Sequence, residues 1–209
     1  MSNIITDLEK NLPPIQGQFQ DINITSRVQE EIDFWNGKRE DNPLVFDRLK
    51  QYWDYVNVSD WSPSGTPWSS AFISYQLRGK EFPRTSAHRI YVQDIIDNKH
   101  PSWIAFSLPK TKDIKLNVGD VLIKPRSGNY NFSHGDIVYK IAQGKAFLVG
   151  GNLGDSAKIT KVYNVDSDNV VQDSVEPYKI ILKKKGMGPG TKVLIPLVVL
   201  GLATIFIMR

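Results

Sequence analysis

Residues 67–75 read Pro-Trp-Ser-Ser-Ala-Phe-Ile-Ser-Tyr, and this stretch decides which fold the sequence predicts. Proline fits the first position of a helix, where its missing N–H costs no hydrogen bond. We therefore expect a helix from Pro67 to about Leu77, with Thr66 as its cap. Ser69 then lies near the third helical position. There its hydroxyl faces unpaired backbone N–H groups and the positive end of the helix dipole, an environment that stabilises an oxyanion.

The elements around this helix predict an α+β fold, with N-terminal helices packed on an antiparallel sheet. A capping-box pattern, Ser26-x-x-Gln29, predicts the start of one helix, and Asn42 followed by Pro43 predicts the start of the next. Another helix is expected from near Ser86. Runs rich in β-formers follow, with Gln143-Gly144 as a hairpin turn. The expected strands are 103–108, 120–125, 135–141, 145–149, 157–164 and 178–182.

The ends of the chain differ from the middle. Residues 1–22 are expected to form an extended arm without a cleaved secretion signal, and residues 23–182 to form the domain. Residues 183–192 are a basic, glycine-rich linker. The uncharged run 193–208 is long enough for about 24 Å of helix, which favours a single-pass membrane anchor over a buried C-terminal helix of the domain. The lysines before it predict that the domain lies on the cytoplasmic or otherwise anionic side.

Composition excludes several classes of function. The chain has no cysteine, so disulfides and thiolate chemistry are excluded, and its three histidines have no metal-ligand spacing. We therefore expect neither a metal nor a cofactor. The net charge of +4 comes from the tail, because five basic residues and no acid follow residue 182, leaving 21 basic against 22 acidic residues elsewhere. A domain with this balance is not expected to bind nucleic acid.

Further motifs follow the 67–75 stretch in a fixed order. They are Ser86-Ala87-His88, Val118-Gly119-Asp120, Ser133-His134-Gly135-Asp136 and Val149-Gly150-Gly151-Asn152. Since 135–141 and 145–149 are expected to form a hairpin, the motifs at His134 and Asn152 should lie side by side on neighbouring strands. A histidine beside a hydroxyl can serve as its general base.

Taken together, the motifs resemble the papain-like cell-wall hydrolases of the NlpC and CHAP superfamily, over roughly residues 24–182. The usual pattern there is Trp-Cys-Ala-Ala-Phe-Val-Ser, and Ser69 stands where that family has its nucleophilic cysteine. The chain looks closest to a branch classed as a domain of unknown function, in which Trp-Ser-Ala-Ala-Phe-Ile-Ser is common. The resemblance implies a papain-like fold and hydrolysis of amide bonds in peptidoglycan or a similar peptide. It implies catalytic roles for Ser69 as nucleophile, His134 as base and Asn152 as the residue that orients the imidazole.

Several alternatives stay open at this point. A serine hydroxyl is a far weaker acid than a thiol, and Ser70 becomes the reactive hydroxyl if the register slips by one. Trp68, His88 and Asp136 are candidates for substrate binding, although a core tryptophan, a structural histidine and a solvated aspartate fit the same sequence. The alternative function is a catalytically inactive structural or binding module on the same fold. A membrane-associated virion protein, or a phage protein at the host envelope, would be such a module.

Overall fold

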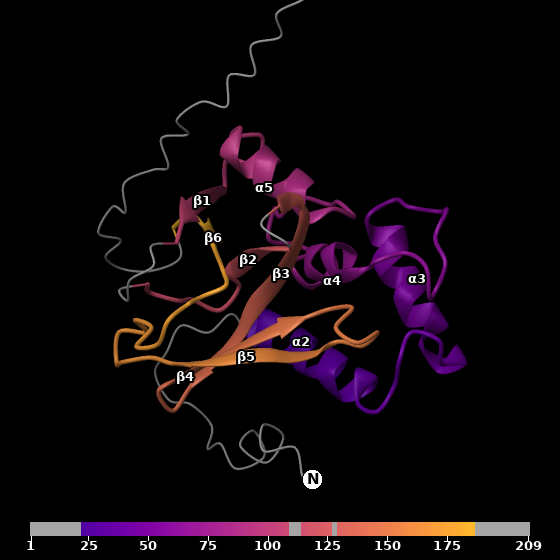
Figure 1. Cartoon of the computed structure of the whole chain (residues 1–209), viewed down its shortest axis with the longest axis horizontal. Helices are drawn as coiled ribbons and strands as arrows, with labels where there is room; N and C mark the ends of the chain where they lie inside the picture. Colours follow the sequence, from indigo (N-terminus) through magenta and orange to yellow (C-terminus); the bar gives the residue numbers. More distant parts are fainter. Residues whose placement is uncertain (1–21, 109–113, 127–128, 187–209) are drawn as a thin grey trace, which may run out of the picture.

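A computed structural model describes residues 22–108, 114–126 and 129–186 of the chain. Its helices precede its strands in sequence (Figure 1), which confirms the α+β prediction. The helical elements are α2 (Ile22–Trp35), the 3-10 helix η1 (Pro43–Val45), α3 (Phe46–Tyr55), α4 (Ser69–Gln76) and α5 (His88–Ile96). The strands are β1 (Trp103–Ser107), β2 (Val121–Arg126), β3 (Asn129–Ala142), β4 (Lys145–Gly150), β5 (Lys158–Asn164) and β6 (Ile180–Lys184).

The strands form one six-stranded sheet in the order β1-β6-β2-β3-β4-β5, and all neighbours pair antiparallel. The predicted hairpin is confirmed, because Ala142 pairs with Lys145 across a two-residue turn. Gln143 and Gly144 have φ of 50° and 68°. Two consecutive positive φ values are what a type I′ turn requires, and this turn matches the twist of the strands that it joins.

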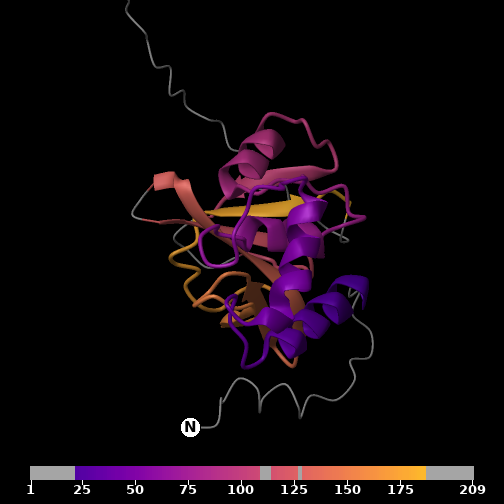
Figure 2. The ribbon, with the colours of Figure 1, turned by 90° about the vertical axis from the view of Figure 1, so that its right-hand side faces the viewer.

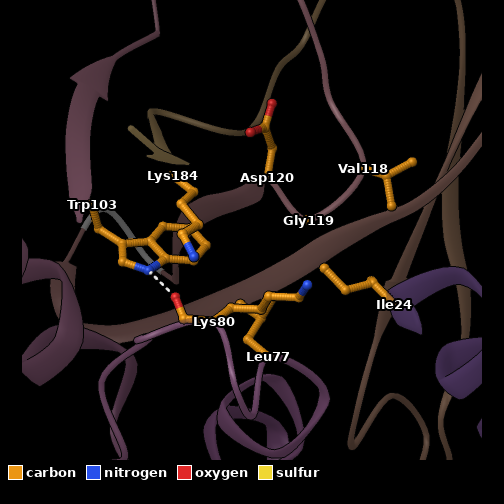
Figure 3. A pocket seen from close by; sticks show the side chains of 8 residues that line it. All are labelled: Ile24, Leu77, Lys80, Trp103, Val118, Gly119, Asp120 and Lys184. Atoms are coloured by element: carbon orange, nitrogen blue, oxygen red, sulfur yellow. Dashed lines mark hydrogen bonds between the residues drawn. The ribbon is translucent and has the colours of Figure 1, made fainter. Parts of the chain in front are cut away.

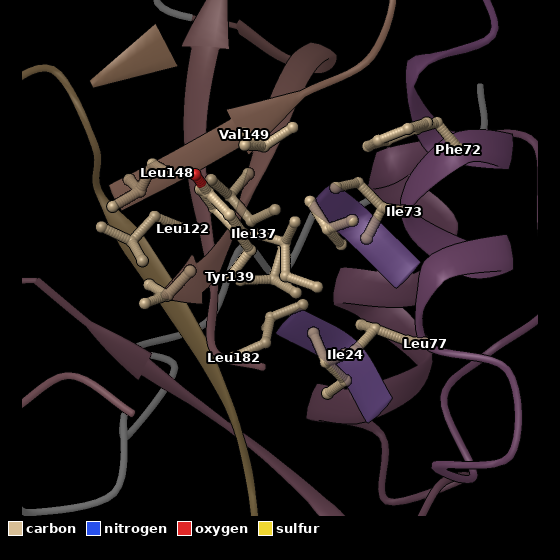
Figure 4. Close-up of a cluster of buried hydrophobic side chains, with 14 of the residues drawn as sticks. Ile24, Phe72, Ile73, Leu77, Leu122, Ile137, Tyr139, Leu148, Val149 and Leu182 are labelled. Atoms are coloured by element: carbon tan, nitrogen blue, oxygen red, sulfur yellow. The ribbon is translucent and has the colours of Figure 1, made fainter. Parts of the chain in front are cut away.

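The core lies between the helices and the sheet. Helices α2, α4 and α5 pack on β3, whereas α3 packs on α4. In Figure 2 the helices α2 and α3 stand in front of the strands. Figure 4 shows Phe72 and Ile73 of α4 facing Ile137 and Val149 of the sheet, and all four side chains are fully buried. This packing fixes α4, and with it Ser69, against β3 and β4.

Two helices begin at other residues than the sequence predicts. Ile24 and Val28 are both buried, so the apolar stripe of α2 starts before Ser26, and that serine lies inside the helix rather than at its cap. The hydroxyl oxygen of Thr66 accepts a hydrogen bond from the Ser62 N–H, at 3.1 Å, within the preceding loop. Helix α4 therefore begins at Ser69, which is its first residue and not its third.

The cap predicted at Asn42 is confirmed. Its side-chain oxygen accepts a hydrogen bond from the Leu44 N–H at 3.0 Å, and Pro43 is the first residue of the 3-10 helix that leads into α3. The cap satisfies a donor that a helix start leaves without an intrahelical partner. This local chemistry sets where the second helical segment begins.

The last strand continues two residues past the predicted domain boundary. Lys183 and Lys184 belong to β6 and pair with Ile104 and Trp103 of β1. The Lys183 ammonium forms an ion pair with the buried carboxylate of Asp120. The first two residues of the predicted linker are therefore part of the sheet.

Most of the predicted arm and the whole predicted membrane segment, 193–208, lie outside the described residues. Within 22–108, 114–126 and 129–186, none of the helices has the length and apolar character needed to cross a bilayer.

Candidate functional site

Ser69 opens α4 and is 5% exposed. Its Oγ lies 2.6 Å from Nε2 of His88, so a hydrogen bond joins the hydroxyl to an imidazole. The first intrahelical bond of α4 runs from the Phe72 N–H to the Trp68 carbonyl. The N–H groups of the residues before Phe72 therefore have no partner within the helix, and they create a positive potential around the Ser69 oxygen.

His88 opens α5 as Ser69 opens α4, and its imidazole is buried between two partners. Its Nδ1 shares a short hydrogen bond with the hydroxyl of Tyr91, one turn further along the helix. Burial, together with the charge of His134, lowers the pKa of His88 to about 3, and the carboxylate of Asp136 offsets only part of this effect. His88 is therefore neutral at physiological pH.

His134 lies within β3, directly opposite Lys124 of β2, and is 1% exposed. Its Nε2 is 3.1 Å from Oδ1 of Asp136, two residues along the same strand face. Its Nδ1 is buried and has no hydrogen-bond partner in the described part of the chain. The His134 ring centroid lies 5.7 Å from that of His88, so the two imidazoles are neighbours.

Asp136 is fully buried and is surrounded by donors. Besides the bond from His134, its Oδ2 accepts hydrogen bonds from the Lys124 ammonium at 3.0 Å and the Tyr178 hydroxyl at 2.5 Å. Burial alone would raise the pKa of Asp136, but the bond and charge of His134, with Lys124 and Tyr178, outweigh it and hold the pKa below its ordinary value. Asp136 is thus a carboxylate at any pH at which the protein is expected to work.

Two glycines leave the room in which these side chains meet. A Cβ on Gly150 would lie 2.2 Å from Oδ1 of Asp136 and 2.8 Å from Nε2 of His134. A Cβ on Gly135 would lie 2.6 Å from the Tyr91 hydroxyl and 2.9 Å from Nδ1 of His88. None of these four distances is compatible with an ordinary contact, so the β3–β4 backbone approaches the polar cluster closely only because these positions lack side chains.

The structure brings Ser69, His88, His134 and Asp136 together, but it places Asn152 differently from the sequence-based expectation. Asn152 lies two residues beyond the end of β4 with φ of 58°, and no hydrogen bond joins its side chain to His134 among the described residues. The position beside the His134 imidazole that was predicted for Asn152 is occupied by Asp136.

Two other predicted residues serve the core. Trp68 is fully buried, stacks on Trp35 with ring centroids 4.7 Å apart, and donates its indole N–H to Glu40. Stacking on a sugar would require an exposed ring, which Trp68 does not offer in this structure. The Ser70 hydroxyl donates to the Thr85 carbonyl at 3.0 Å, so it helps to hold the loop before α5.

Sequence reasoning missed three residues of the site. Tyr91 could have been found, because His88 and Tyr91 are three residues apart and share one face of a helix. The position of Lys124 beside Asp136 depends on the β2–β3 register, which no local sequence motif specifies. Tyr178 lies 42 residues after Asp136 and carries no signal that would connect the two.

A separate small pocket lies away from this cluster (Figure 3). It is lined by Trp103, Asp120 and Lys184 among others, and its volume is about 10 Å³, roughly room for one water molecule. Among the described residues, no group of three or more His, Asp or Glu side chains has a geometry that could hold a metal ion.

The cluster holds the groups that nucleophilic acyl transfer needs: a hydroxyl at a helix N-terminus, neutral imidazole, and a histidine backed by a carboxylate. Its members come from α4, α5 and β3, which the core packs together. No protein-family model and no curated protein matches the chain.

Proposed function

We propose that this protein is a hydrolase that cleaves amide bonds, with Ser69 as its nucleophile, on a papain-like fold of the NlpC/CHAP type. The observation that carries the proposal is the 2.6 Å hydrogen bond between the Ser69 hydroxyl and His88 at the start of α4, with the His134–Asp136 pair beside it. A serine used only to start a helix needs no buried imidazoles around its hydroxyl. Two histidines and a carboxylate in one apolar interior suit proton transfer better than packing.

The reaction that suits this arrangement is acyl transfer. As the Ser69 oxygen attacks a carbonyl carbon, its proton moves to an imidazole and negative charge develops on the carbonyl oxygen. The N–H groups of the first turn of α4 are suited to stabilise that charge. Return of the proton to the leaving amine breaks the amide bond, and water then hydrolyses the acyl-enzyme.

Peptidoglycan is the proposed substrate, because the ordered motifs around Ser69, His134 and Asn152 resemble cell-wall hydrolases. The uncharged run 193–208 is proposed as the anchor that holds the domain at a membrane, with the domain on the anionic side. A location in a phage virion or at a host envelope would fit a membrane-anchored enzyme of this kind.

The second candidate function is an inactive structural or binding module on the same fold. It is favoured by one observation, the burial of the site: Ser69 is 5% and His134 is 1% exposed. A hydrolase needs its nucleophile to reach substrate, so the active form would have to expose Ser69. A module that only binds or scaffolds needs no such opening.

The proposal is tested by incubating the full-length chain, in detergent, with purified peptidoglycan. We expect soluble fragments to be released by the wild type and by Ser70→Ala, and no release by Ser69→Ala. Ser70→Ala is a matched control because it removes a neighbouring hydroxyl that donates to the backbone carbonyl of Thr85. Equal release by wild type and Ser69→Ala would exclude Ser69 as nucleophile, and no release by any of the three would favour the inactive module.

A further inference from the structure

The hydroxyl of Tyr91 sets the direction of the hydrogen bonds in the site. Burial, and after it the charge of Asp136, raises the pKa of Tyr91 well above its ordinary value, so the phenol keeps its proton. The Tyr91 side chain is fully buried, and Nδ1 of His88 is the acceptor that its hydroxyl meets among the described residues. A buried O–H that donates to no acceptor is costly. Tyr91 therefore donates to Nδ1 of His88.

This direction determines the tautomer of His88. A neutral imidazole carries one proton, and with Nδ1 accepting from Tyr91 that proton is on Nε2. Nε2–H then donates to the Ser69 oxygen, at 2.6 Å. In this tautomer His88 has no lone pair directed at Ser69, so it cannot take the serine proton. It acts instead as a donor that stabilises negative charge on Oγ.

The tautomer of His134 follows from Asp136. Oδ1 of this carboxylate has no proton to give, so Nε2 of His134 must be the donor across their 3.1 Å contact. In neutral His134, Nδ1 is then a bare lone pair. This is the same atom that is buried without a hydrogen-bond partner among the described residues, in a ring whose centroid lies 5.7 Å from that of His88. A lone pair with a carboxylate behind its ring is the arrangement of a general base.

We propose that His134 is the general base for Ser69, that Asp136 is its positioning residue in the place predicted for Asn152, and that His88 is a neutral hydrogen-bond donor to the nucleophile. The assignment rests on the proposed hydrolase function. Nδ1 of His134 forms no hydrogen bond with Ser69 in this structure, so in the reaction the hydroxyl must first come within hydrogen-bond distance of it. The Ser69 proton then moves to Nδ1 of His134 while Oγ bonds to the carbonyl carbon. The resulting imidazolium is stabilised by Asp136, and Nδ1–H later protonates the leaving amine.

The tautomers can be measured without any substrate, by nitrogen-15 NMR of the imidazoles in the full-length chain at neutral pH. We expect His88, and His134 in its neutral form, to carry the proton on Nε2. A His88 with its proton on Nδ1 and a bare Nε2 would overturn the assignment, because it could then accept the Ser69 proton itself. This readout is independent of whether Ser69 reacts.

The role of Asp136 is tested with Asp136→Asn. The Lys124 ammonium and the Tyr178 hydroxyl both donate to Oδ2, so they force the amide oxygen of asparagine to that side and its NH₂ toward His134. His134 must then accept at Nε2 and carry its proton on Nδ1. We expect this change of tautomer in the spectrum and a loss of about 10²- to 10⁴-fold in the rate at which a fluorophosphonate probe labels Ser69.

Asp120→Asn is the matched control, because Asp120 is also buried and paired with a lysine but belongs to the separate pocket near β6. It should leave the labelling rate and the His134 tautomer unchanged. If the probe labels the wild type and labels Asp136→Asn at the same rate, the positioning role of Asp136 is refuted. The hydrolase proposal would then remain intact. An unlabelled wild type would refute the hydrolase proposal, and the assignment with it.

The two histidines are separated by parallel glutamine variants. Glutamine at position 88 keeps an N–H donor near the Ser69 oxygen, so we expect His88→Gln to slow labelling by no more than about tenfold. His134→Gln removes the base, so its labelling rate should fall as much as that of Asp136→Asn. Thermal melting of both variants checks that the fold persists. A larger loss in His88→Gln than in His134→Gln would make His88 the base and overturn the proposal.

Discussion

At the scale of single residues, the site combines a weak acid with surroundings that favour its ionisation. Ser69 has the N-terminus of α4 on one side and two imidazoles on the other. The negative charge of the site lies on the Asp136 carboxylate, which three donors hold ionised inside the protein. Removing one of those donors would leave a buried charge incompletely paired, which is more costly than losing an exposed ion pair.

The buried, neutral His88 predicts that stability falls in mild acid. Its pKa is about 3 in the folded protein against 6.5 in an unfolded chain, so between these values the unfolded chain binds a proton that the folded protein does not. The free energy of unfolding should therefore decrease as pH falls from about 6.5 toward 3, by about 5 kcal/mol in total. Chemical denaturation at a series of pH values measures this slope.

His88→Gln should flatten that slope, because it removes the buried imidazole whose protonation opposes folding. A wild-type stability that does not change between pH 6.5 and 4 would contradict the neutral state of His88. Below about pH 4 the protonation of Asp136 adds a second loss, because its folded-state pKa is depressed and its stabilising contribution disappears as the carboxylate takes up a proton.

The residues of the site were predictable to different degrees. Ser69 and His134 stand in motifs whose order could be recognised along the chain. The partner of His134 was not predictable, because Asp136 and Asn152 were both polar candidates on neighbouring segments. The β2–β3 register, which places His134 opposite Lys124, and the room left at Gly150 decide between them. The direction of the hydrogen bonds at His88 depends on the buried hydroxyl of Tyr91. That burial results from tertiary packing, which the local sequence does not reveal.

At the scale of elements, two helix starts meet one strand. Helices α4 and α5 direct Ser69 and His88 toward β3, and Gly135 and Gly150 let the β3–β4 hairpin come close to them. The site therefore depends on backbone approach as much as on its polar side chains. A methyl group at either glycine would have to displace the polar side chains of the cluster.

Gly150→Ala is predicted to destabilise the protein by about 3 kcal/mol and to abolish labelling of Ser69, because its Cβ would overlap Asp136 and His134. Gly37→Ala is the comparison: its φ of 70° is strained for alanine, but no atom lies within 4 Å of the added Cβ. That variant should cost about 1 kcal/mol and keep the labelling rate. Urea denaturation and probe labelling measure both, and a Gly150→Ala protein that labels like wild type would contradict the described packing.

The elements themselves were largely predictable, for a physical reason. Alternating and apolar runs specify strands, and the Gln143-Gly144 turn chemistry joins two of them. Helix starts were less predictable, since a capping pattern such as Ser26-x-x-Gln29 also occurs inside a helix when the apolar stripe begins earlier. The start of α4 was uncertain in the same way: the sequence predicts Ser69 at the third helical position, whereas it is the first residue of the helix.

At the scale of the whole molecule, β6 runs into the lysine cluster Lys183–Lys185, because Lys183 and Lys184 are its last two residues. Lys183 neutralises the buried Asp120, and Lys184 pairs with β1 at the edge of the sheet. These lysines therefore stabilise the fold, in addition to placing positive charge before the proposed membrane anchor. The predicted boundary was set by composition alone, and the charge of a lysine does not reveal whether it faces a buried carboxylate.

Two truncations separate these roles. A chain ending after Gly186 keeps all of β6 and should melt within about 2 °C of the full-length protein. A chain ending after Leu182 removes the ammonium partner of the buried Asp120 and should lose about 3 kcal/mol of unfolding free energy. Calorimetry compares the two, and equal melting temperatures would contradict a structural role for Lys183. If 193–208 is the anchor, both truncated chains should also lose binding to anionic lipid vesicles.

The central claim is that the hydroxyl of Ser69 is a nucleophile activated by its buried surroundings. The most direct measurement is to treat the full-length chain with a fluorophosphonate and to locate the adduct by mass spectrometry of its peptides. We predict one adduct, on Ser69, that is retained in Ser70→Ala and absent in Ser69→Ala. An unlabelled wild-type protein, or an adduct that persists in Ser69→Ala, would contradict the claim.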